Sequence, residues 1–144
     1  MDQQQPAISA RALSPDQIDA LEDRFYAFNA GRTGHRDYAQ LAFVAEIDGS
    51  TAGAVAGYSW GGYCELRQLW IDQTHRGKGL GRRLMTRAIH EARSRGCGAI
   101  YLFTFSFQAP DFYAGFGFER VCELRDKPRG HSDILMRLDL TQPL

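Results

Sequence analysis

The stretch HRGKGLGRRLM (residues 75–85) decides how this chain is expected to fold. It follows the run CELRQLWID (64–72), which has the composition of a strand, and it opens a segment whose apolar residues recur at helical spacing. Three glycines and four lysine or arginine residues crowd into it. A glycine-rich turn between a strand and a helix predicts an anion site, because backbone N–H groups and the helix N-terminus both favour negative charge there.

The bulk composition limits the possible partners of this anion site. The chain has 144 residues, 44% of them apolar, which suits one domain with a real core. Its 17 basic and 17 acidic residues leave no net charge, which disfavours nucleic acid and membrane partners. The N-terminus lacks a signal-peptide pattern and no apolar run could span a membrane, so we expect a cytoplasmic protein. Cys64, Cys97 and Cys122 are widely spaced and are expected to be reduced core thiols.

The pattern on either side of the stretch predicts a single α/β (α+β) domain. A strand–helix–strand crossover centred on the stretch should make its two strands parallel within a mixed sheet. The expected elements are a strand at 6–13, a helix from Ser14 to near Gly31, two strands joined at Asp48-Gly49, a strand at 63–72 after Gly61-Gly62, a helix from Gly79 to Gly96, a strand at 98–107, a short helix at 109–114 and closing strands at 117–124 and 132–140.

Two common phosphate-binding loops do not fit the stretch. A P-loop requires Ser or Thr directly after Gly77-Lys78, where Gly79 stands. The dinucleotide fingerprint G-x-G-x-x-G fails as well, because Arg82 or Leu84 occupies its last glycine position. The histidines and cysteines also lack metal-ligand spacing, so no metal is expected.

The pattern that does fit is Arg76-x-x-Gly79-x-Gly81. It resembles the pyrophosphate loop, Q/R-x-x-G-x-G/A, of the GNAT superfamily of acetyl-CoA-dependent N-acetyltransferases. A second segment, SFQAPDFYAGFGF (106–118), is similar to that family's pattern N-x-x-A-x-x-L/F-Y-x-x-x-G-F, with Ser106 in place of the usual Asn. The resemblance covers about residues 40–138.

This resemblance implies a GNAT fold over residues 1–144, with residues 1–5 disordered. The mixed central sheet would have about six or seven strands flanked by helices. In this family the strands that match residues 63–72 and 98–107 splay apart, and the pantetheine arm of acetyl-CoA inserts between them. Many relatives dimerise, so a homodimer is compatible with the resemblance.

The resemblance also implies the co-substrate and the residues that bind it. Acetyl-CoA would place its pyrophosphate on the backbone of the loop and its pantetheine arm along the strand before it. The expected acetyl-CoA-binding residues are Leu69, Trp70, Ile71, Arg76, Gly77, Lys78, Gly79, Leu80, Gly81, Arg82, Ser106, Phe112 and Tyr113.

The implied reaction is direct attack of a primary amine on the thioester in a ternary complex, with an unknown small-molecule or peptide acceptor. Tyr113 occupies the family's general-acid position. Glu65 is the candidate base that takes the proton from the amine, and His131 or a water chain is the alternative. Members that acetylate protein N-termini often carry Glu where Tyr101 stands here, which argues mildly against that class of acceptor.

Two other function classes stay open at this point. A non-catalytic acyl-CoA-binding or sensing domain would keep the same loop. A nucleotide-binding or RNA-stacking module is suggested by the alternation of Phe103, Phe105 and Phe107, but core packing explains these residues better in a chain without a basic surface. The overall pattern resembles that of a bacterial GNAT acetyltransferase.

Overall fold

The computed structural model describes residues 4–142. The chain divides into two compact units, one ending at His35 and the other beginning at Arg36, and each is described by itself. Residues 1–3, part of the segment expected to be disordered, lie outside the described residues.

Helix α1 (Pro15–Thr33) begins where the sequence predicts. The Ser14 side chain accepts a hydrogen bond from the Gln17 N–H at 3.2 Å, and the Gln17 side chain accepts one from the Ser14 N–H at 2.9 Å. This reciprocal capping box satisfies two N–H groups at the helix start. The helix continues two residues past Gly31, near which it was predicted to end. Gly34 is the residue that adopts the left-handed conformation (φ 78°) and ends the helix.

The strand predicted at residues 6–13 does not form. Residues 4–14 are neither helical nor extended into a ladder, and Ile8 is 97% exposed. A strand requires a neighbour that pairs with its backbone, and apolar area must favour that pairing. Four of the eight residues at 6–13 are Pro or Ala, so the alternation offers little apolar area to bury. Among residues 4–142, no helix has the length and hydropathy needed to cross a membrane.

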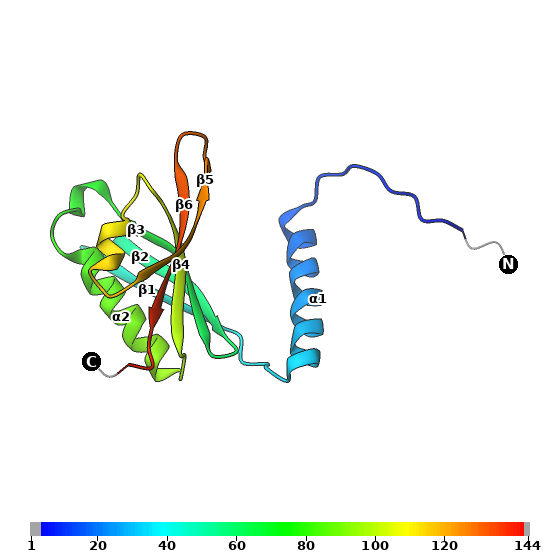
Figure 1. Ribbon diagram of the computed structural model, residues 1–144, viewed down its shortest axis with the longest axis horizontal. Helices are drawn as coiled ribbons and strands as arrows, with labels where there is room; N and C mark the ends of the chain where they lie inside the picture. The colour runs from blue at the N-terminus through cyan, green and yellow to red at the C-terminus, as the bar shows by residue number, and fades with distance from the viewer. Residues whose placement is uncertain (1–3, 143–144) are drawn as a thin grey trace. The chain divides into compact units, whose positions relative to one another are not determined.

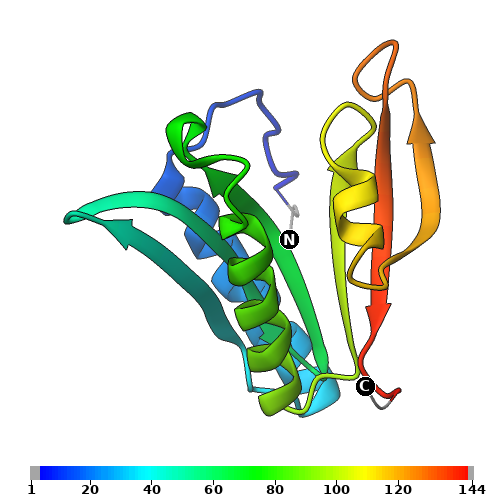
Figure 2. The ribbon, with the colours of Figure 1, turned by 90° about the vertical axis from the view of Figure 1, so that its left-hand side faces the viewer.

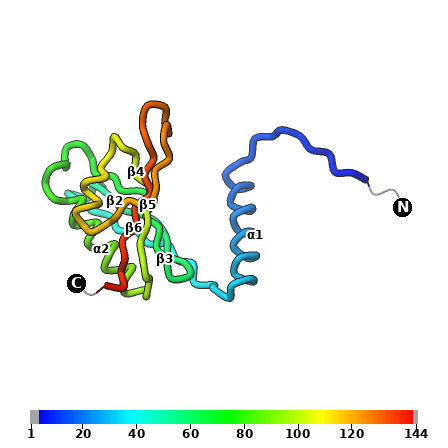
Figure 3. Tube along the Cα trace, in the orientation of Figure 1, coloured from blue at the N-terminus to red at the C-terminus, as the bar shows by residue number. Residues whose placement is uncertain are grey.

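Within residues 36–142, six strands form one mixed sheet in the order β1-β2-β3-β4-β6-β5 (Figure 1). The strands are β1 (Ala39–Ile47), β2 (Ser50–Trp60), β3 (Tyr63–Ile71), β4 (Ala99–Phe105), β5 (Glu119–Arg125) and β6 (Ser132–Asp139). The predicted fold class and the parallel β3–β4 crossover are confirmed. The β5–β6 hairpin lies beside β4, which the trace in Figure 3 makes easy to follow.

Two predicted turns are also confirmed. Asp48 and Gly49 have φ values of 51° and 78°, and Gly61 and Gly62 have values of 59° and 86°. Positive φ at both central positions gives the chain a twist that matches the flanking strands, which is why such residues join antiparallel neighbours.

Helix α2 (Leu80–Ser94) and the shorter α3 (Pro110–Ala114) complete this unit. The predicted apolar stripe of α2 packs on β1 to β4 and forms the core together with inward-facing strand residues. Its fully buried members are Leu84, Met85, Ala88 and Ala92.

Two expectations about buried residues are wrong. Phe103 is 48% exposed and Phe107 is 55% exposed. Phe103 alternates along β4 with buried Leu102 and Thr104, so its side chain points away from α2. Core packing therefore does not explain these two phenylalanines.

The cysteines differ in their environment as well. Cys64 and Cys97 are buried free thiols, as predicted, whereas Cys122 is exposed. Cys122 lies on the edge strand β5, where every residue is exposed. Burial raises the pKa of the Cys64 thiol to about 12, which keeps it protonated.

A β-bulge separates the paired part of β3 from its unpaired part. On the β2 side, Ala56 pairs with Gln68 and Gly57 pairs with Leu66, so Arg67 is an extra residue in β3. On the β4 side, pairing runs from Tyr63 to Leu66 and ends directly before this bulge. Beyond that point the two strands diverge, as Figure 2 shows. The splayed strand pair expected from the family resemblance is therefore present.

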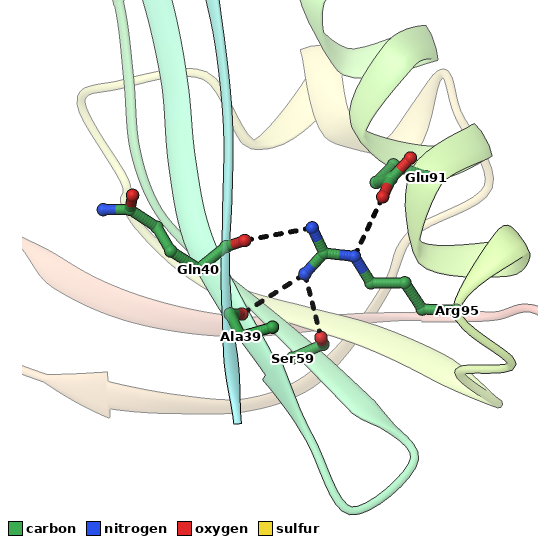
Figure 4. Close-up of polar contacts among 5 residues, drawn as sticks. All are labelled: Ala39, Gln40, Ser59, Glu91 and Arg95. Atoms are coloured by element: carbon green, nitrogen blue, oxygen red, sulfur yellow. Dashed lines mark hydrogen bonds and ion pairs between the residues drawn. The ribbon is translucent and has the colours of Figure 1, made fainter. Parts of the chain in front are cut away.

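The C-terminal end of α2 is fastened to the start of the sheet by Arg95 (Figure 4). Its guanidinium donates to the Ala39 and Gln40 carbonyl oxygens at 3.2 and 3.0 Å and to the Ser59 hydroxyl at 3.0 Å. It also pairs with Glu91 at 3.0 Å. One side chain therefore joins α2, β1 and β2.

Candidate active site

The predicted anion loop leaves its backbone donors free. Gly77 and Gly79 adopt left-handed φ values of 77° and 80°, and Gly79 caps α2 without any side-chain hydrogen bond. Within the part of the chain that the structure describes, the backbone N–H groups from Gly77 to Arg82 find no hydrogen-bond acceptor. The first α2 hydrogen bond runs from the Arg83 N–H to the Gly79 carbonyl. Such a row of donors at a helix start fits an anion.

Three segments that the sequence predicts for one site meet at this loop. A methyl group on Gly81 would lie 3.5 Å from the Phe112 ring and 3.8 Å from the Ile71 side chain. Gly81 lies in the first turn of α2, Ile71 ends β3 and Phe112 belongs to α3. The glycine loop, the last residues of β3 and the second motif are thus neighbours.

The arginines beside the loop are held by other groups. Arg76 donates through Nε to the Ile71 carbonyl oxygen at 2.9 Å, and its guanidinium lies 4.6 Å from the centre of the Trp70 ring. The Arg82 guanidinium lies 5.5 Å from the centre of the Phe116 ring. Both guanidinium groups therefore flank the loop while they lie over aromatic rings.

The predicted pantetheine segment, Leu69–Ile71, lies in the part of β3 beyond the bulge. It pairs with β2 through residues 53–55, and no β4 residue pairs with it within residues 36–142. Leu69 and Ile71 pack partly into the core, whereas Trp70 is 61% exposed. The β4 side of this backbone therefore has no strand partner, although its Ile71 carbonyl oxygen accepts a hydrogen bond from Arg76, and an extended ligand could lie along it.

Tyr113 lies on α3 and packs against the core. Its ring meets Phe112 and Phe118 edge-on, with ring centres 5.2 and 6.0 Å away. Burial raises the pKa of its hydroxyl, so the group is protonated at neutral pH and can donate a proton or a hydrogen bond.

Ser106, the residue that replaces the family's Asn, joins β4 to the start of β6. Its hydroxyl accepts a hydrogen bond from the Ser132 N–H at 3.0 Å, and its own N–H donates to the Ser132 carbonyl at 2.8 Å. A contact between this hydroxyl and the pantetheine arm stays a prediction.

Glu65 and His131, the two candidate bases, lie at different ends of β4. Glu65 pairs in register with Tyr101, near the paired end of β4. Asp133 pairs with Phe105 at the other end, and His131 precedes it in the β5–β6 loop with its ring 4.8 Å from Phe107. The four residue steps from Tyr101 to Phe105 span on the order of 13 Å. One amine therefore cannot use both residues as its direct base.

The partners of Glu65 were not predicted from the sequence. The Tyr101 hydroxyl donates to its carboxylate at 2.7 Å, and the Tyr58 hydroxyl lies 3.4 Å from that of Tyr101. The only signal available was the spacing of aromatic residues on separate strands, which becomes meaningful only when the register is known.

A cavity of about 470 Å³ lies between α2 and β1. Its lining includes Leu80 and Arg82 from the loop end and Phe43 from β1, but neither Glu65 nor Tyr113. It therefore borders the anion loop without being the place where a thioester would meet both of those groups.

Residues 7–118 match the model of the acetyltransferase (GNAT) family. The chain belongs to this family. It is therefore an acyltransferase enzyme with the GNAT fold, as the glycine loop and the second motif indicate.

Individual relatives support the same assignment. The chain is 30% identical over 114 residues to acetyltransferase Atu2258 of Agrobacterium fabrum, covering 78% of this chain and 83% of that protein. It is 37% identical over 95 residues to blasticidin-S acetyltransferase of Streptomyces morookaense, covering 64% of this chain and 68% of that protein.

Solved structures agree on the fold. A putative acetyltransferase from Agrobacterium tumefaciens superposes with a TM-score of 0.85 at 25% identity, covering 94% of this chain and all of that one. A putative streptothricin acetyltransferase from Bacillus anthracis, solved in complex with acetyl coenzyme A, has a TM-score of 0.62 at 21% identity and covers 70% of this chain and 62% of that one.

Proposed function

We propose that this GNAT enzyme transfers the acetyl group of acetyl-CoA to a primary amine by direct attack in a ternary complex. The observation that carries the proposal is the row of unpaired N–H groups from Gly77 to Arg82 beside the unpaired half of β3. A polyanion joined to an extended arm would occupy both features at once.

The donor would bind in two parts. The pyrophosphate sits on the N–H groups of the loop, with Lys78 and Arg82 adding charge and Arg76 bracing the end of β3. The pantetheine arm runs along Leu69–Ile71, on the side of that backbone without a β4 partner and near Phe112, and we expect Ser106 to contact it.

The chemistry needs one group that takes a proton and one that gives one. An amine with a pKa near 10.4 is protonated at neutral pH, so a base must deprotonate it before attack. Glu65 is our candidate for that base. Tyr113 donates to the sulfur as the bond between the acetyl carbon and sulfur breaks.

The acceptor is proposed to be a small-molecule amine. The support is the 37% identity to a blasticidin-S acetyltransferase, whose name gives a small-molecule substrate. The mild sequence argument against protein N-termini at Tyr101 points the same way. The free thiols of the described chain suit a reducing compartment, so we propose that the reaction takes place in the cytoplasm.

The test begins with donor binding. Calorimetric titration should give tight binding of acetyl-CoA and binding of S-acetylpantetheine, which lacks the pyrophosphate, that is about 100-fold weaker, because two or more charge-assisted hydrogen bonds are missing. Equal affinity for the two ligands would contradict the loop assignment.

Turnover is then measured as CoA release with polyamines, aminoglycosides, amino acids, lysine peptides and blasticidin S as acceptors. Tyr113→Phe should lower kcat about 100-fold while acetyl-CoA affinity is kept. Acetyl-CoA binding without release of CoA in any reaction would instead favour a non-catalytic acyl-CoA-binding domain.

A further inference from the structure

The carboxylate of Glu65 is held from two sides. The Tyr101 hydroxyl donates to Oε2 at 2.7 Å, and Arg67 Nε lies 3.3 Å from Oε1. The distance to Tyr101 is that of a charge-assisted hydrogen bond, whereas the distance to Arg67 is within the range of an ion pair but long for a charge-assisted hydrogen bond. The Glu65 side chain is 15% exposed and that of Arg67 is 56% exposed, so the Tyr101 contact is the sheltered one.

Three neighbouring strands build this arrangement. Tyr58 on β2 pairs in register with Glu65 on β3, and Glu65 pairs with Tyr101 on β4. The three side chains therefore form one row across the sheet, on the face opposite buried Cys64 and Ile100. Strands fix the spacing of such a row more firmly than loops do.

The groups around the carboxylate set its charge environment. Tyr58 faces it from β2, Arg67 from its own strand and Tyr101 from β4. Arg137 pairs with Tyr101 on β6, but its Nε donates to the Tyr63 hydroxyl at 2.8 Å. Burial, and then the hydrogen bonds with Tyr58 and Glu65, raise the pKa of Tyr101, so its hydroxyl stays protonated and remains a donor.

The row lies next to the point where the strands separate. Leu66 and Leu102 form the last β3–β4 pair, one residue beyond Glu65 and Tyr101. A pantetheine arm that enters along Leu69–Ile71 would bring its thioester toward this point. His131 lies beyond the far end of β4.

We propose that Tyr101 is a positioning residue that aims the Glu65 carboxylate at the acceptor amine through its hydrogen bond to Oε2, which makes Glu65 the base of the reaction. This inference rests on the proposed function. Oε2 stays bound to Tyr101, and Oε1 exchanges the exposed Arg67 for the acceptor ammonium.

The proton balance is complete with these groups. The ammonium gives one proton to Glu65 Oε1, and the freed nitrogen lone pair forms the bond to the thioester carbon. The bond between carbon and sulfur then breaks, and the sulfur leaves as thiolate and receives a proton from Tyr113. The nitrogen then loses a second proton to solvent, and Glu65 releases the proton that it accepted. One of these two protons returns to Tyr113, so the reaction releases one proton in total.

Tyr101→Phe tests the proposal because it removes the donor and keeps the ring. The acidic limb of the kcat/KM profile, measured with the best amine of the panel above, should move about one to two pH units higher, since the ionised carboxylate loses a hydrogen bond. Acetyl-CoA affinity should not change. Tyr63→Phe is the matched control, because it removes a neighbouring hydroxyl that binds Arg137, and should leave the limb in place.

Two further variants complete the test. Glu65→Gln should remove the acidic limb and lower kcat/KM about 100-fold or more. Tyr58→Phe should move the limb in the same direction by a smaller amount, and it serves if Tyr101→Phe does not fold. An unchanged limb in a folded Tyr101→Phe variant, or loss of the limb in His131→Gln, would overturn the inference.

A measurement without turnover separates this inference from the proposed function. In protein labelled with carbon-13 at the glutamate carboxyl groups, the Glu65 signal is assigned by its loss in Glu65→Gln. Its titration midpoint should be higher in Tyr101→Phe than in the wild type, and equal midpoints would reject the positioning role even where acetyl transfer is observed. Failure of the wild type to bind acetyl-CoA would instead reject the proposed function.

Discussion

The two ends of α2 differ in how completely their polar groups are satisfied. At the C-terminal end, Arg95 makes hydrogen bonds to two β1 carbonyl groups and to Ser59. At the N-terminal end, the N–H groups from Gly77 to Arg82 have no acceptor within residues 36–142. An unsatisfied donor costs free energy unless water or a ligand supplies the partner, so the difference separates the end that stabilises the fold from the end where we propose that acetyl-CoA binds.

The strands beneath α2 repeat this difference. Near the C-terminal end of α2, β3 and β4 pair through Tyr63–Leu66 and Ala99–Leu102. Near the N-terminal end, β3 has lost its β4 partner. The bulge at Arg67 marks the boundary between the paired and unpaired parts of β3. A substitution that disturbs it should therefore have the largest effect on stability and on acetyl-CoA binding.

Gly57→Ala should disturb the bulge that separates the paired part of β3 from its unpaired part. A Cβ at Gly57 would overlap the carbonyl oxygen of Glu65 and lie 2.9 Å from the Leu66 Cα, so the bulged part of β3 would have to move. We expect a loss of roughly 3 kcal/mol in the free energy of unfolding, measured by urea denaturation, and a loss of acetyl-CoA binding in the fraction that folds.

Gly98→Ala is the control for this substitution. Its Cβ would meet its nearest neighbours at 3.8 and 4.0 Å, which is ordinary contact, so its unfolding free energy should change by less than about 0.5 kcal/mol. Normal acetyl-CoA affinity in Gly57→Ala would mean that the bulge is not needed for the open strand.

The sequence predicted the glycine loop because the donors of the loop are local. Residues 76–82 bring their own turn and their own helix start, so a short pattern carries the whole feature. The hairpin turns were predictable for the same reason, since positive φ at Asp48-Gly49 depends on those two residues.

The bulge, and the row formed by Tyr58, Glu65 and Tyr101, could not be predicted from local patterns. Both depend on the register of three strands, and a shift of one residue would turn each side chain to the opposite face. The missing first strand has a similar origin. Residues 6–13 alternate as a strand should, but pairing depends on a neighbour that the segment does not contain.

Arg95→Ala tests the satisfied end of α2. The side chain is 25% exposed and donates to three oxygen atoms besides pairing with Glu91, so its loss should lower the unfolding free energy by about 2 kcal/mol. Acetyl-CoA affinity of the folded protein should not change, because the loop lies at the other end of the helix.

Arg93→Ala is the matched control, since Arg93 belongs to the same helix turn and its side chain makes no hydrogen bond that the described residues reveal. Its stability should stay within about 0.5 kcal/mol of the wild type. A drop in acetyl-CoA affinity for Arg95→Ala comparable to its drop in stability would show that the two ends of α2 are coupled rather than separate.

Gly79 and Gly81 sharpen the comparison at the open end, with the smallest expected effects. Ala at Gly79 would have open space but must adopt φ 80°, which costs about 1 kcal/mol and disturbs the direction of the loop N–H groups. Ala at Gly81 lies in the helix with ordinary contact to Phe112, so it should stabilise the fold by about 0.5 kcal/mol and leave acetyl-CoA affinity unchanged. Thermal unfolding should therefore show lower stability for Gly79→Ala and higher stability for Gly81→Ala. Calorimetric titration should show weaker acetyl-CoA binding for Gly79→Ala alone. Equal acetyl-CoA affinity in both variants would mean that the left-handed conformation of Gly79 does not set the direction of the loop N–H groups.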